Sequence, residues 1–179
     1  MDVLKAIKER RSVRSFESKQ IPEETIKDLL ESIRWSPSWA NSQCWEVIIV
    51  KDHETKKKLQ ETLPKGNPAR DSVIEAPVLF AICGQLKKAG YYKGSYPTKF
   101  GDWFMFDLGI ATQNLCLCAH SLGLGTVIIG LFDHEKAKEI LNVPEGYELV
   151  VLVPVGYPKK IPSAPKRKEI KDFVHYERF

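Results

Sequence analysis

The chain of 179 residues is long enough for one domain with a full-sized core, and its 43% hydrophobic and 28% charged residues are typical of a globular protein. Its net charge of +4, from 27 basic and 23 acidic residues, is too small to favour a nucleic-acid partner. The sequence has no apolar run long enough to cross a bilayer, and its first residues lack the apolar stretch of a signal peptide, so we expect a cytoplasmic protein with no membrane partner.

A brief amphipathic opening over residues 1–9 is followed, after a basic run, by a predicted helix that ends near Trp35. Pro22 suits the first helical position, and the two glutamates after it favour the positive end of the helix dipole. The apolar positions of this helix recur at helical spacing, at Ile26, Leu29, Leu30 and Ile33.

The middle of the chain predicts two strands separated by a surface helix and a loop. In chain order, we expect a buried strand at 45–50, a charged helix at 54–62, a loop at 64–68, a strand at 77–83 and an irregular loop at 90–101. Residues 103–122 then predict the longest helix, which is apolar on more than one face and therefore central and buried. Gly123 is placed to end it in the left-handed conformation.

The last third of the chain predicts two strands, at 126–129 and 149–153, with a short helix between them that Asp133 caps. The second strand is continuously apolar, which indicates cover on both faces. Residues 158–179 are basic and weakly patterned, and we expect an arm that needs a partner to be ordered. Helices and strands do not alternate regularly, so the sequence predicts one α+β domain over residues 1–179.

Most chemical motifs are missing from the sequence. The four cysteines, Cys44, Cys83, Cys116 and Cys118, form no CxxC pair, and free thiols are the expected state. The glycines from Gly123 to Gly130 follow a helix and open a strand, the reverse of a dinucleotide-binding loop. Because no acid–base, nucleophile or metal-ligand pattern is visible, any difficult chemistry is expected to belong to a cofactor.

The run from Arg10 to Phe16 places three guanidinium groups and two hydroxyl groups in one short stretch. A guanidinium group can hold two phosphate oxygens at once, so the run predicts a fixed anionic ligand. A solvated basic turn is the alternative that the run alone leaves open.

The arginine run is the first of four motifs that occur in a fixed order along the chain. They are Arg10-Arg11-Ser12-Val13-Arg14-Ser15-Phe16, the stretch from Ser36 to Trp45, the stretch from Leu122 to Asp133, and Val155-Gly156-Tyr157-Pro158. Together they resemble the FMN-dependent nitroreductase family over nearly the whole chain. The resemblance implies an α+β fold with a central, mostly antiparallel sheet flanked by helices. It also implies an intertwined homodimer with two FMN sites, each built from both subunits, with the arm at 158–179 packing on the partner.

The resemblance also implies which residues bind the flavin. The N-terminal run contributes Arg10, Arg11, Ser12 and Arg14. The segment that matches the part supplied by the partner subunit contains Pro37, Ser38, Trp39, Ala40, Asn41 and Gln43. The loop facing the reactive edge of the flavin contains Gly130 and Leu131, and Arg167 matches a phosphate ligand near the C-terminus. Asn67 and Arg70 match a further ribityl and ring contact if a small gap is allowed.

The chemistry of these side chains agrees with such roles. Arg10, Arg11 and Arg167 would neutralise the FMN phosphate. A fixed cation beside the ring, Arg14 or Arg70, would favour the reduced flavin and raise its reduction potential. A backbone N–H at Gly130 would reach flavin N5, and the catalytic step needs no side chain of the protein. The sequence leaves open which arginine meets the phosphate and which the ring.

One residue departs from the family pattern: Cys44 stands where the family often has proline. An inert packing role for its thiol is the preferred interpretation, and a thiol near the flavin is the alternative. The aromatic loop at 90–104 is expected to form either a wall for the substrate or part of the core or dimer.

The predicted function is an FMN-dependent oxidoreductase that takes hydride from NADH or NADPH. The flavin passes it to a nitroaromatic compound, a quinone or a similar small-molecule acceptor. Two alternatives remain open: a specialised flavin enzyme that dehalogenates a substrate or degrades flavin, and a flavin-binding protein without turnover.

Overall fold

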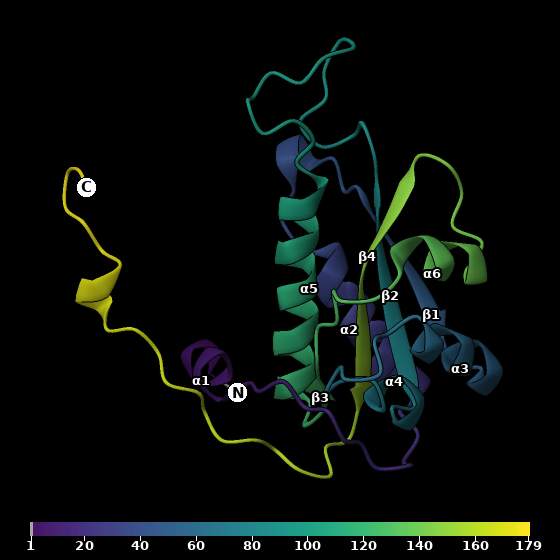
Figure 1. Ribbon diagram of the computed structural model, residues 1–179. Coiled ribbons are helices and arrows are strands. Elements are labelled where there is room, and N and C mark those ends of the chain that lie inside the picture. The colour runs from purple at the N-terminus through teal and green to yellow at the C-terminus, as the bar shows by residue number, and fades with distance from the viewer. Residues whose placement is uncertain (1) are drawn as a thin grey trace.

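The computed structural model describes residues 2–179 and contains a four-stranded antiparallel sheet with helices on both faces (Figure 1). In spatial order the strands are β1 (Trp45–Val50), β2 (Val78–Gln85), β4 (Tyr147–Gly156) and β3 (Gly125–Thr126). The α+β class and the mostly antiparallel sheet are therefore confirmed.

Alternate side chains of β2 point into two separate cores, as the two-residue repeat of a strand requires. Val78, Phe80 and Ile82 belong to one core, and Leu79, Ala81 and Cys83 belong to the other. The helices of the first face are α2 (Glu23–Arg34) and α5 (Phe104–Ser121). Those of the second face are α3 (His53–Glu61), α4 (Ser72–Glu75) and α6 (His134–Ile140).

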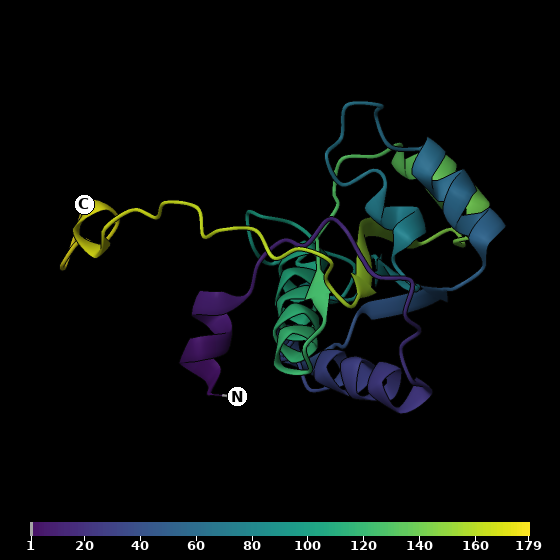
Figure 2. The ribbon, with the colours of Figure 1, turned by 90° about the horizontal axis from the view of Figure 1, so that it is seen from below.

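Two segments reach away from this body. Helix α1 (Val3–Glu9) and the arm at 158–179, which contains a short 3-10 helix (Ile170–Asp172), extend on the same side of the molecule in both views (Figures 1 and 2). Most of their large apolar side chains are exposed, namely Val3, Leu4, Ile7, Ile161, Ile170, Phe173, Tyr176 and Phe179. The last part of the arm, from Ile170 onward, therefore makes little contact with its own domain.

The predicted helices are confirmed to within two residues, and Gly123 ends α5 with φ +77° as expected. Pro22 lies one position earlier than expected, as the cap of α2. The four-residue helix α4 was not predicted, because one turn is too short to show a helical repeat. Within residues 2–179, no helix has both the length and the apolar character needed to cross a membrane.

Four predictions of burial or extent are wrong. β1 is an edge strand with only Val50 fully buried, because β2 alone pairs with it. Helix α5 is buried on one side only, and Met105 and Phe106 are exposed. β3 has two residues instead of four, because Val127 turns into the second core; Ile129 then pairs with Leu152 as an isolated bridge. β4 extends beyond the predicted 149–153 at both ends.

Candidate functional site

The arginine run lies along the outer edge of β3 because its two apolar residues are anchored in the interior. Val13 and Phe16 are only 3% and 1% exposed. A parallel bridge joins Ser12 to Thr126, and the Val13 N–H donates to the Thr126 carbonyl at 2.9 Å. The inward-facing apolar residues leave the arginines of the run at the surface.

Two glycines make this anchoring possible. A Cβ atom on Gly125 would lie 2.7 Å from the Cβ of Val13, and one on Gly156 would lie 2.9 Å from Phe16 Cδ1. Both distances are far below van der Waals contact. The glycines that flank the run in space therefore set how closely it approaches the sheet.

The run and the arm together form a basic cavity of about 270 Å³. The residues that line it are Arg10, Arg11, Ser12, Arg14, Pro162, Ser163, Pro165 and Arg167. Four of these carry guanidinium groups and none carries a carboxylate. Such a set of donors is suited to a phosphate or another compact anion. The structure thus brings together arginines that lie more than 150 residues apart in the sequence.

The arginines differ in how many donors they have free. Arg11 Nη1 donates to the carbonyls of Lys8 (2.6 Å) and Arg10 (2.8 Å), where it caps the end of α1. Arg14 Nη1 donates to the Ser12 carbonyl at 3.3 Å. The Arg10 guanidinium donates to no acceptor within residues 2–179, so it keeps its full set of donors for a ligand.

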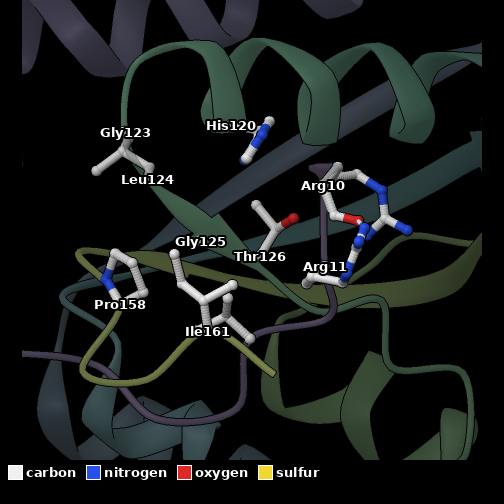
Figure 3. Close-up of a pocket in the computed structure, with 10 residues that line it drawn as sticks. Arg10, Arg11, His120, Gly123, Leu124, Gly125, Thr126, Pro158 and Ile161 are labelled. Carbon is white, nitrogen blue, oxygen red and sulfur yellow. Dashed lines mark hydrogen bonds between the residues drawn. The ribbon is translucent and has the colours of Figure 1, made fainter. Parts of the chain in front are cut away.

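Arg10 and Arg11 also line a smaller cavity of about 180 Å³ below the end of α5 (Figure 3). His120 extends from α5 toward Thr126 on the side of this cavity where Arg10 lies. Its Nε2 atom is buried and has no hydrogen-bond partner among the described residues. An unpartnered buried nitrogen beside two arginines indicates room for a further polar group.

A third cavity, of about 330 Å³, places Arg14 together with the loop at Gly130. Asn67 also lines it and donates from Nδ2 to the Leu131 carbonyl at 3.1 Å. Arg14 is shared with the basic cavity, so the two cavities lie next to each other. Arg70 does not line either of them; it is half-buried, and its Nε has no partner within residues 2–179.

The Gly130 N–H is available to a ligand because of the pairing of Ile129. The main chain of Ile129 exchanges two hydrogen bonds with Leu152, at 2.9 and 3.0 Å, so the Ile129 carbonyl points toward β4. The N–H of the same peptide unit belongs to Gly130 and points the opposite way. No acceptor for it lies within the described part of the chain.

The predicted segment at 37–43 lies elsewhere. The Trp39 N–H donates to both carboxylate oxygens of Asp107, at 3.1 Å each, near the start of α5. The arginine run lies beside His120, near the end of that helix. At about 1.5 Å of rise per residue, Asp107 and His120 are about 20 Å apart along the helix axis. One chain therefore does not bring together Arg10 and the set Pro37, Ser38, Trp39, Ala40, Asn41 and Gln43.

Two residues of the site region were not predicted from the sequence. Ser163 lines the basic cavity, but nothing in the weakly patterned arm distinguishes it. Asp107 is 1% exposed and is the one acidic residue in the described α5. A lone acidic residue among the apolar residues of the first half of the helix was the signal that could have found it.

Cys44 lies beside Asp107 in the interior. Burial and the nearby Asp107 carboxylate raise the pKa of the Cys44 thiol to about 11. Because the thiolate is the reactive form of cysteine, this environment supports an inert thiol.

The sequence model of the nitroreductase family matches residues 7–157 of the chain. The chain belongs to the nitroreductase family. Membership confirms the resemblance carried by the four motifs and the prediction of an oxidoreductase of this family.

Relatives of this nitroreductase-family chain match it over almost its whole length. A Methanothermobacter thermautotrophicus protein, provisionally named NADH dehydrogenase/NAD(P)H nitroreductase, is 33% identical, and the match covers 100% of this chain and 88% of the relative. The FMN reductase (NAD(P)H) of Bacillus subtilis is 30% identical, with 98% and 73% covered. A nitroreductase family protein from Clostridium difficile, at 24% identity with both chains fully covered, has the same fold with a TM-score of 0.86.

Proposed function

We propose that this protein is an FMN-dependent NAD(P)H oxidoreductase that reduces a small-molecule acceptor such as a nitroaromatic compound or a quinone. The observation that carries the proposal is the pair of adjacent cavities. One is lined by four guanidinium groups, and the other contains the free N–H of Gly130. FMN has the matching parts, a phosphate at one end and a redox-active ring at the other.

The residues present fit this cofactor. A phosphate monoester carries about −1.5 to −2 charges near pH 7, and the basic cavity offers Arg10, Arg11 and Arg167 without a competing carboxylate. The second cavity offers a main-chain donor at Gly130 and the amide of Asn67. Arg14 lines both cavities, which favours Arg14 over Arg70 as the cation beside the ring.

When bound, FMN would supply the hydride-transfer chemistry. The chain's own part is to bind and to orient. Arg10, Arg11 and Arg167 would hold the phosphate, and the Gly130 N–H would be offered to the ring. Arg14 would place a positive charge beside the ring and so favour its reduced form. No side chain has to exchange a proton, in agreement with the missing acid–base motifs.

We also propose a homodimer in which each site receives residues 37–43 from the partner subunit. Within one chain these residues lie at the far end of α5 from the arginine run. Apolar side chains on α1 and α5 are exposed in the single chain, with Leu4 63%, Met105 56% and Phe106 61% exposed. A second copy would cover them, and the arm at 158–179 would lie on its surface.

Anaerobic reduction tests the proposed function. NADH or NADPH added to FMN-loaded protein should bleach the flavin, and a quinone should restore its colour. Steady-state consumption of NAD(P)H with a quinone separates an enzyme from a flavin-binding protein without turnover. A flavin that neither nucleotide bleaches would contradict the proposal.

A further inference from the structure

The segment from Ser38 to Cys44 is strained. Three of its residues that carry side chains lie in the left-handed region: Ala40 with φ 44°, Asn41 with φ 56° and Gln43 with φ 48°. Alanine rarely adopts this conformation because its Cβ crowds the backbone. Such conformations persist only where the surroundings impose them, and they concentrate at functional sites.

A single buried carboxylate joins both ends of this segment. Asp107 accepts the Trp39 N–H on both oxygens, at 3.1 Å each. Its Oδ2 also accepts the Ser42 hydroxyl at 3.3 Å and the Cys44 thiol at 3.6 Å. Three donors from one segment therefore converge on one side chain that is almost inaccessible to water.

No cation competes for this carboxylate, since Asp107 forms no ion pair within residues 2–179. A buried charge is tolerated when hydrogen bonds satisfy it, so the segment and Asp107 constrain each other. Ser38 adds a second tie, because its Oγ accepts the Gln43 N–H at 2.9 Å. The ring of Trp39 also packs against that of Trp103, with their centroids 5.0 Å apart.

We propose that Asp107 is a positioning residue that holds Trp39 to Gln43 in the strained shape in which they meet the flavin of the partner subunit. This inference rests on the proposed function. Cys44, the departure from the family's proline, takes part in the same arrangement as a hydrogen-bond donor.

The test compares D107A, D107N and S42A with N114A. Asn114 is a matched control, because it lies on the same helix and donates from Nδ2 to Ser36 Oγ at 2.8 Å, just before the strained segment. Each variant is assayed for melting temperature, FMN dissociation constant, near-ultraviolet circular dichroism from the Trp39–Trp103 pair, and alkylation of Cys44 followed by peptide mass spectrometry.

We expect D107A to weaken FMN binding by about tenfold or more, which corresponds to about 1.4 kcal/mol. D107N keeps one oxygen acceptor and should recover part of the FMN affinity. S42A should lower the FMN affinity a few-fold. D107A should also alter the tryptophan signal and speed the alkylation of Cys44. N114A should stay within about twofold of the wild type in FMN affinity even where it loses as much thermal stability.

Equal FMN affinity in D107A and N114A at equal loss of melting temperature would overturn the proposal. If D107A does not fold, the proposal is tested by comparing D107N and S42A with N114A in FMN affinity and melting temperature. A wild-type protein that takes up no FMN would instead contradict the proposed function. In that case the alkylation of Cys44 and the tryptophan signal still decide whether Asp107 holds the segment.

Discussion

Replacing Gly125 by alanine tests whether close packing against β3 sets the position of the arginine run. The new methyl group would lie 2.7, 2.8 and 2.9 Å from the Cβ, Cγ2 and Cγ1 atoms of Val13. Val13 has little room to retreat, since it is 3% exposed and its N–H is bonded to Thr126. Relief therefore requires the backbone of the run to move away from β3.

Overpacking of this kind costs about 1–3 kcal/mol. A loss of 1 kcal/mol lowers the melting temperature of a chain of this size by about 2–4 °C. We expect G125A to melt about 2–12 °C lower than the wild type and to bind FMN more weakly, because Arg10 and Arg14 move with the backbone. Thermal unfolding followed by circular dichroism and an FMN titration measure the two effects.

Two further variants sharpen this prediction. V13A removes both Cγ atoms but keeps the Cβ at 2.7 Å, so the double variant G125A/V13A should not recover the stability of wild type. Gly66 is the matched stability control, because a Cβ there meets nothing within 4 Å, and G66A should change stability by no more than about 0.5 kcal/mol. The reasoning would be refuted if G125A melted at the same temperature as the wild type, or if V13A restored the stability of G125A.

Four other outcomes follow from the arginines and Cys44. R10A should weaken FMN binding by about tenfold to 100-fold, the loss of one charge-assisted contact of about 1.5–3 kcal/mol. R11A should cost less affinity and more stability, because Arg11 also caps α1; titration and melting separate the two. R14A should lower the flavin midpoint potential more than its occupancy, and unchanged potential with lost flavin would reverse that assignment. Cys44 should resist alkylation at pH 7–9 and react faster only as the pH approaches its pKa of about 11, which mass spectrometry of the labelled peptide can follow.

Local patterns in the sequence were enough to predict most of the fold. The continuous apolar run of the strand at 77–83, the apolar length of α5 and the stop at Gly123 are each encoded within a few residues. Burial was harder to predict, because it depends on contacts with residues that are distant in the sequence. β1 has the composition of a central strand, but only the sheet order shows that it lies at the edge.

Prediction of the site was also limited to what local sequence patterns encode. Family motifs indicated the arginine run and Arg167, but only the three-dimensional structure shows that they line one cavity with Ser163. The capping role of Arg11 and the strained backbone from Ala40 to Gln43 arise from tertiary contacts. No periodicity reports such contacts, which is why the positioning role inferred for Asp107 could not be predicted.

The visible spectrum of the purified protein, before and after addition of FMN, tests the central claim most directly. We predict a yellow protein, or a colourless one that takes up one FMN per chain and holds it through gel filtration. R10A should lose that flavin more readily than R11A. A colourless wild-type protein that takes up no FMN would contradict the flavin site proposed at Arg10, Arg14, Gly130 and Arg167.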